Sequence, residues 1–95
     1  MGGYVVVDVS WSSAEARQSY LDLFRPSLEP YGGVVTCVSQ DAHVMEGDWH
    51  PDGTTVLLSF PTLKDALAWY NSEEYRPALD IRKQSSSSRL LIFGE

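Results

Sequence analysis

Four short runs of β-branched and other apolar residues divide the chain, at 4–9, 34–38, 54–60 and 89–93. Each run is too short for a helix and lies next to polar residues or proline, which is typical of buried strands. The pattern therefore predicts four strands. A further apolar stretch, 42–45, follows a polar step after the second run, and it predicts a bulged continuation of that strand.

The segment after the first strand predicts an amphipathic helix. Ser12 with Glu15 fits a capping box, in which the hydroxyl and the carboxylate bond reciprocal backbone donors. Apolar residues then recur at spacings of three and four, which places one stripe against a core, and the charged residues between them, including Arg17 and Arg25, are expected to face outward. Pro26 predicts a kink or a restart, because proline removes an intrahelical hydrogen bond.

A second helical segment follows the third strand. Thr62 with Asp65 offers another capping box, and apolar positions continue at helical spacing to Tyr70. Ser72 predicts the N-cap of a further helical stretch that passes through Arg82. The four serines at 85–88 read as a linker before the last strand.

The element order is strand, helix, strand, strand, helix, strand. This order predicts an α+β, ferredoxin-like βαββαβ fold, with a four-stranded antiparallel sheet that carries its helices on one face. The strands are apolar on both faces: Leu58 and Leu57 would point to opposite sides of the third strand, and Ile92 and Leu91 to opposite sides of the fourth. Helices can cover one face only, so we expect a homodimer through the open sheet face.

Length and charge narrow the range of functions. The 95 residues suffice for one domain, 1–95, and its 43% hydrophobic content is that of a globular protein. A formal charge of −6 disfavours nucleic-acid and anionic-membrane partners. The start of the chain lacks the basic residues and the long apolar run of a secretory signal, and a single cysteine cannot form an internal disulfide. We therefore expect a cytoplasmic protein.

Several groups of residues together resemble a known family. They are Tyr31-Gly32-Gly33, Glu46-Gly47-Asp48-Trp49-x-Pro51, Phe60-Pro61, Ala66-x-x-Trp69-Tyr70-x-Ser72-x-Glu74-Tyr75 and Arg82. Over nearly the whole chain this pattern is similar to domain of unknown function family 1330. The resemblance implies a dimeric α+β barrel, the fold shared with small monooxygenases and muconolactone-isomerase-like proteins. It does not imply a reaction, since fold does not carry function.

The sequence offers little support for metal or nucleotide chemistry. His43, Glu46, Asp48 and His50 are potential metal ligands, but Gly47 interrupts them and no compact histidine pair accompanies them. A solvated acidic loop is the simpler interpretation. The chain has no glycine-rich phosphate loop, no nucleophile elbow and no redox cysteine pair. We expect a protein without a metal and without a cofactor.

Three residues are candidates for proton transfer. Asp8 is the one acid within an apolar strand, where a buried carboxylate needs partners or an altered pKa, and it is a candidate general base. An ion pair with Arg82 or Arg89 is the structural alternative. Tyr20 and His50 complete the catalytic candidates.

Four further residues are candidates for ligand binding. Trp49, Tyr70 and Tyr75 combine apolar bodies with polar tips, which suits the wall of a cleft, although core packing explains them equally well. Arg82 is the candidate anion contact, because its guanidinium is a planar fork of donors. Two hypotheses follow: a cofactor-independent binder of or enzyme for an aromatic, polyketide-like or carboxylated metabolite, and a non-enzymatic dimeric module.

Overall fold

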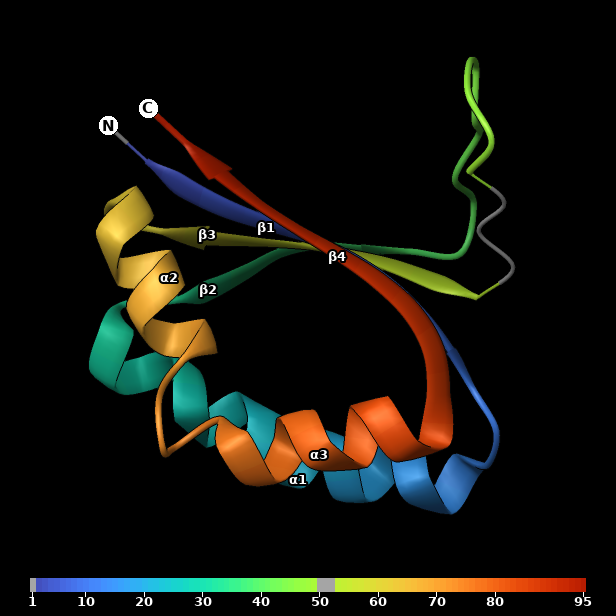
Figure 1. Ribbon diagram of the computed structural model, residues 1–95, viewed down its shortest axis with the longest axis horizontal. Helices are drawn as coiled ribbons and strands as arrows, with labels where there is room; N and C mark the ends of the chain where they lie inside the picture. Colours follow the sequence, from blue (N-terminus) through green and yellow to red (C-terminus); the bar gives the residue numbers. More distant parts are fainter. Residues whose placement is uncertain (1, 50–52) are drawn as a thin grey trace.

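The predicted α+β fold is confirmed by the computed structural model, which describes residues 2–49 and 53–95. The elements in chain order are β1 (Gly3–Trp11), α1 (Ala14–Leu28), the 3₁₀ helix η1 (Glu29–Tyr31), β2 (Val34–Ser39), β3 (Thr54–Phe60), α2 (Leu63–Tyr70), α3 (Arg76–Ser85) and β4 (Ser86–Gly94). The strands form one antiparallel sheet in the order β2-β3-β1-β4. The helices all lie on one face of this sheet (Figure 1).

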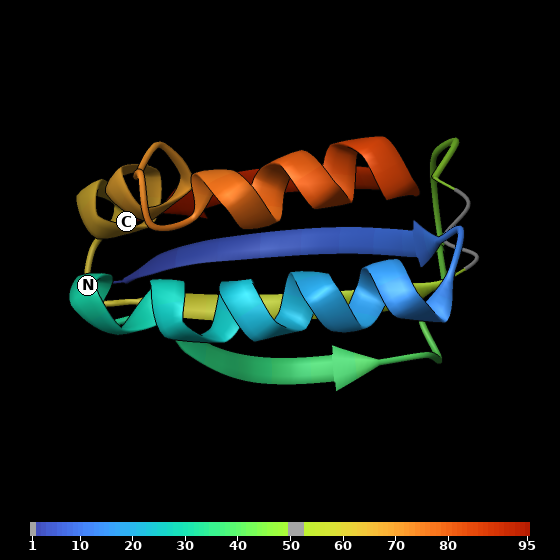
Figure 2. The ribbon, with the colours of Figure 1, turned by 90° about the horizontal axis from the view of Figure 1, so that it is seen from below.

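Helices α1 and α3 run side by side beneath the sheet, and α2 packs near the end where the two chain termini meet (Figure 1). Seen from the helix side, β2 lies beyond α1 and no helix covers it (Figure 2). No helix covers edge strand β2, and its helix-facing residues Val35 and Val38 are 40% and 61% exposed.

The core lies between the sheet and the helices. Alternate residues of β1, namely Val5, Val7 and Val9, are buried on the helix face, and Leu58 of β3 pairs with Val5 on the same face. The helices contribute Tyr20, Phe24, Leu28, Ala66, Trp69, Ala78 and Leu79. The apolar spacing that predicted the helices is thus the spacing that fills the core.

Helix α1 departs from expectation at both ends. Its N-cap is Ser13, whose Oγ accepts the backbone N–H of Ala16, whereas the Oγ of Ser12 donates to the carbonyl of Ser85. The helix also continues through Pro26 to Leu28 without the expected restart. Burial of Ser27 and Leu28 against the core holds this last turn helical despite the hydrogen bond that proline removes.

Three other local predictions need correction. Residues 42–45 are not a strand, since pairing of β2 with β3 ends at Ser39 and Thr55. Ser72 caps a turn rather than a helix: its Oγ accepts the N–H of Tyr75, and α3 begins at Arg76. The predicted serine linker is structured, because 86–88 form the start of β4 and pair with the end of β1.

The second face of the sheet has no helix over it. Val34 and Leu91 are each 59% exposed on that face and Phe93 is 47% exposed. Beyond the end of β2, the segment 40–49 extends away from the helices, to the side of the open face (Figure 1), and it carries Met45 with 86% of its surface exposed. One chain therefore leaves a broad apolar surface uncovered.

Candidate functional site

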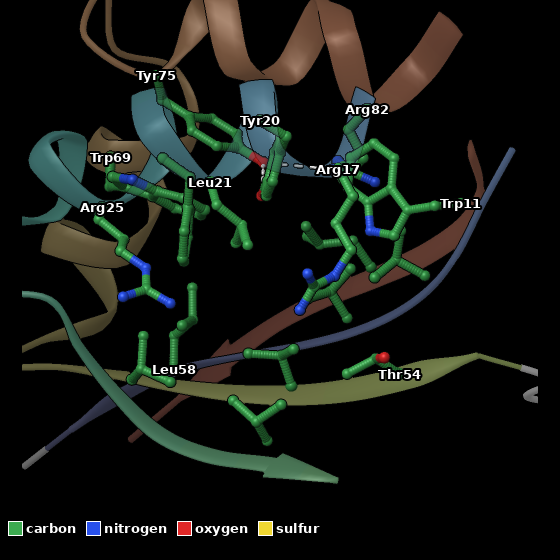
Figure 3. A pocket seen from close by; sticks show the side chains of 17 residues that line it. Trp11, Arg17, Tyr20, Leu21, Arg25, Thr54, Leu58, Trp69, Tyr75 and Arg82 are labelled. Carbon is green, nitrogen blue, oxygen red and sulfur yellow. Dashed lines mark hydrogen bonds between the residues drawn. The ribbon is translucent and has the colours of Figure 1, made fainter. Parts of the chain in front are cut away.

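A cavity of about 110 Å³ lies between α1 and the helix-facing side of the sheet (Figure 3). Its apolar lining comes mainly from the strands and from α1, and its polar lining comes from the helix layer. The lining residues are Val7, Val9, Trp11, Arg17, Tyr20, Leu21, Phe24, Arg25, Val35, Val38, Thr54, Val56, Leu58, Trp69, Tyr75, Arg82 and Leu90. An apolar cavity with a few convergent polar groups is the usual form of a small-molecule site.

Local structure fixes the polar inner end of this cavity. Tyr20 belongs to the apolar stripe of α1, one turn before Phe24, and their rings stack with centroids 5.3 Å apart. Tyr75 ends the turn that Ser72 caps, immediately before α3, and it is fully buried. Arg82 lies on the buried side of α3 near its C-terminus. Three separate segments thus place these side chains together.

Hydrogen bonds connect the three side chains. The hydroxyls of Tyr20 and Tyr75 are 2.9 Å apart, and Arg82 Nε donates to the Tyr75 oxygen at 3.3 Å. Arg82 Nη1 also donates to the Oγ of Ser88. Either hydroxyl can be the donor of the hydrogen bond between Tyr20 and Tyr75. Because this bond uses one of the two hydroxyl protons, the other is available to donate into the cavity, which both residues line.

The environment of Tyr20 keeps it protonated. Burial raises the pKa of its hydroxyl well above the ordinary value of 10.0, and the neighbouring Tyr75 adds to this effect, while Arg82 opposes it. Because its pKa is raised, the Tyr20 hydroxyl stays protonated at neutral pH, and the phenolate that could act as a base is not formed. The protonated hydroxyl of Tyr20 can donate a hydrogen bond, and Arg82 is a second donor at the same end.

Two arginines of α1 line the cavity nearer its open side. Figure 3 shows the guanidinium groups of Arg17 and Arg25 extending from α1 toward the sheet, with Leu21 between them along the helix. Both arginines are exposed, as expected, and their guanidinium groups also reach the cavity. They flank the apolar stripe, and their long side chains reach back over its edge into the cavity.

The sequence candidates separate into two groups. Tyr20, Tyr75 and Arg82 line the cavity together. Tyr70 is half-buried next to Tyr75, with ring centroids 6.2 Å apart, and is not part of the lining. The candidate His50 lies outside the described residues.

Asp8 and Trp49 lie on the other face of the sheet. Asp8 alternates with the inward-facing valines of β1, and Trp49 Nε1 donates to its Oδ2 at 3.3 Å. Arg89 lies over the Trp49 ring at 5.4 Å from the centroid. Within the described part of the chain, Asp8 has no ion pair, and its Oδ1 and the Oγ1 of Thr55 are buried without a hydrogen-bond partner. Asp8 is thus separated from the cavity by the sheet.

Sequence reasoning missed Arg17, Arg25 and Trp11 as cavity residues. Arg17, Leu21 and Arg25 recur at intervals of four, a signal for one shared side of α1.

Among the residues that the structure describes, no group of three His, Cys, Asp or Glu side chains is placed to hold a metal ion. None of the described helices is long and apolar enough to cross a membrane.

Solved structures share this fold. A protein of unknown function from Rhodopseudomonas palustris is similar with a TM-score of 0.75 and 22% identity, over 99% of this chain and 82% of that one. A dimeric ferredoxin-like protein of unknown function from Thermobifida fusca gives a TM-score of 0.67 at 14% identity, over 100% and 92%. SnoaB from Streptomyces nogalater, described as a cofactor-independent oxygenase, gives 0.61 at 14%, over 99% and 92%.

At these identities the likeness shows the fold alone, and the ferredoxin-like description agrees with the strand order found here. A comparison with curated proteins finds no match. One family model matches residues 2–95, which confirms the resemblance seen in the sequence. The chain therefore belongs to the family described as domain of unknown function DUF1330.

Proposed function

We propose that this protein binds a small organic molecule in the cavity between α1 and the sheet, without a cofactor. The observation that carries the proposal is the hydrogen-bonded group of Tyr20, Tyr75 and Arg82 at the inner end of a cavity that the strands line mainly with apolar side chains. Hydrogen-bond donors with a purely structural role can lie in a filled core. Donors that border a cavity are instead placed to bind an oxygen atom of a ligand.

Binding has more support than catalysis. The described lining contains phenol and guanidinium donors but no carboxylate or imidazole that would take a proton. An isomerase-, cyclase- or monooxygenase-like reaction is the enzymatic form of the proposal, in which these donors would polarise a carbonyl or stabilise an oxyanion. SnoaB, described as a cofactor-independent oxygenase, has a similar fold, and this similarity supports the enzymatic form of the proposal.

A cavity-filling variant tests the proposal. Thermal-shift screening of aromatic and polyketide-like compounds, with and without carboxyl groups, would supply binders, which are then titrated into the Leu21→Trp variant. Leu21 lines the cavity, whereas Leu23 on the same helix is 40% exposed and does not, so Leu23→Trp is the matched control. We expect Leu21→Trp alone to abolish binding. The absence of any binder, or equal binding by both variants, would contradict the proposal.

A second proposal concerns assembly: the open sheet face joins two copies in a homodimer. Its support is the exposed apolar surface of Val34, Leu91 and Phe93, beside the projecting segment 40–49. The similar protein from Thermobifida fusca is described as dimeric. Burial of about 600 Å² of apolar surface per chain would contribute about 15 kcal/mol per chain to the free energy of association, before the entropy of association is subtracted.

If the protein forms the homodimer but binds no ligand in the cavity, it is a non-enzymatic dimeric module, which is the alternative function. In that case the cavity is a packing defect and no compound from the screen binds it. Light scattering coupled to size-exclusion chromatography measures the assembly directly, and a stable monomer at micromolar concentration would contradict the homodimer.

A further inference from the structure

The cavity is a positively charged region in an acidic protein. The chain has 13 Asp+Glu against 7 Lys+Arg, yet three of the seven cationic residues line this cavity. No aspartate or glutamate is among its described lining residues. The charge of the site is thus opposite to that of the molecule as a whole.

Arg82 is a buried cation without an anion beside it. It is 4% exposed, and its side-chain hydrogen bonds go to the neutral hydroxyls of Tyr75 and Ser88. No carboxylate of the described residues lies within salt-bridge distance of its guanidinium. A buried charge is ordinarily paired, because removal from water is costly. Its side chain adjoins the cavity, so a bound anion would supply the missing partner.

Arg17 and Arg25 extend this positive field toward the open side. Both side chains are exposed on α1, and neither makes an ion pair with any carboxylate in the described ranges. The nearby acid Asp22 accepts a hydrogen bond from Gln18 instead. Two free guanidinium groups beside an apolar opening attract an anion and leave its apolar body to the valines of the strands.

The size of the cavity limits the apolar body. A cavity of about 150 Å³ holds benzene in another protein. The 110 Å³ here is smaller, so the enclosed part of a ligand is at most a single ring or a short chain.

We propose that the ligand is a small carboxylate with one aromatic ring or a short apolar chain, whose carboxylate is held by Arg82 and by the hydroxyl pair of Tyr20 and Tyr75. Arg17 and Arg25 attract it at the opening. This inference rests on the proposed function, because it names the ligand class of the same cavity.

Calorimetric titration with benzoate, phenylacetate and salicylate, each paired with its neutral amide, tests the inference. We expect each carboxylate that binds to bind at least about tenfold tighter than its amide, since charge-assisted hydrogen bonds are the stronger ones. The preference should fall as salt is added. In Arg82→Gln the preference should disappear, because the carboxylate loses its buried charged partner. The exposed Arg76 is the matched control, and Arg76→Gln should keep the preference.

Two further variants separate the roles. Arg82→Lys should retain only part of the preference, because an ammonium lacks the planar fork. The double variant Arg17→Gln, Arg25→Gln should weaken carboxylate binding and its salt dependence by a few fold. If Arg82→Gln fails to fold, the carboxylate-to-amide ratio of the unmodified protein still decides.

The contrary outcomes are distinct. Equal affinity for carboxylates and amides would overturn the anion inference and leave the proposed cavity function in place. No binding by any of the three carboxylates would also overturn the inference, while a neutral hit in the thermal-shift screen would preserve the proposed function. Failure of the entire screen would overturn both.

Discussion

The indole Nε1 of Trp69 donates a hydrogen bond of 3.0 Å to the Oγ of Ser27, and both side chains are buried. The two residues lie 42 positions apart, on α2 and α1. Ser27 also donates to the carbonyl of Phe24 in its own helix. This bond fixes the orientation of Trp69, whose ring forms part of the cavity wall.

Replacement of Ser27 by alanine should destabilise the fold. The buried indole N–H would lose its acceptor, which costs about 1 to 3 kcal/mol in the free energy of unfolding. Urea denaturation of Ser27→Ala measures this loss. Ser19 is exposed on the same helix, and Ser19→Ala should change stability by less than about 0.5 kcal/mol. Equal effects of the two substitutions would show that the hydrogen bond contributes nothing.

Stability should fall in alkaline solution because of Tyr20. Burial raises the pKa of its hydroxyl above 10.0, so above about pH 10 the folded state keeps a proton that the unfolded state releases. The contribution of Tyr20 is therefore fully present below pH 10 and decreases as pH rises further, by about 1.4 kcal/mol per pH unit.

Urea denaturation between pH 8 and about pH 11 measures this dependence, and Tyr20→Phe should show a shallower decline than the unmodified protein. At pH 8 the phenylalanine variant should already be less stable by about 1 to 3 kcal/mol, because the buried Tyr75 hydroxyl loses its hydrogen bond to Tyr20. Parallel pH profiles for the two proteins would rule out a raised pKa at Tyr20.

A charge on the open sheet face should dissociate the proposed homodimer. Leu91 is 59% exposed on that face in a single chain, and Leu91→Arg would place a cation inside the interface. We expect light scattering to report a monomer for this variant. Leu23→Arg, on the outer side of α1, serves as the control and should remain dimeric. Dimers of unchanged stability in both variants would place the interface elsewhere.

Gly3 should not accept a side chain. A Cβ at this position would lie 2.3 Å from the carbonyl oxygen of Thr62, where β1 passes close to the start of α2. The backbone must shift to relieve this contact, so Gly3→Ala should cost about 1 to 3 kcal/mol. Gly2→Ala meets only the movable hydroxyl end of Tyr4 and should cost much less by thermal denaturation. Similar melting temperatures for both variants would contradict this close approach.

The sequence predicted the fold because local patterns and core packing agree. The stripe through Tyr20, Phe24 and Leu28 and the apolar run of β1 specify both the elements and the faces they bury. The errors occur where tertiary contacts override local preference. Pro26 is held within α1 by its buried neighbours, and the serines at the start of β4 gain strand structure from pairing with β1.

The sequence predicts several residues of the candidate site, but it does not predict how they are arranged in space. Amphipathic side chains make Tyr20 and Tyr75 candidates, and its fork of donors makes Arg82 one. No local pattern indicates that α1, the turn before α3 and α3 bring their polar ends together. Asp8 illustrates the converse: its place in an apolar strand suggested chemistry, whereas alternation along β1 directs it to the face opposite the cavity.

The start of β4 connects the inner end of the cavity to the sheet. Ser88 accepts a hydrogen bond from Arg82, and Ser86 donates to the Arg82 carbonyl, while both serines pair with β1. These small polar residues add little apolar contact, so this end of the strand should open locally at lower free energy than the end at Ile92. A ligand held by Arg82 would stabilise the closed form. Amide hydrogen exchange at 86–88 would then slow on binding, and it reports occupancy of the cavity from the backbone alone.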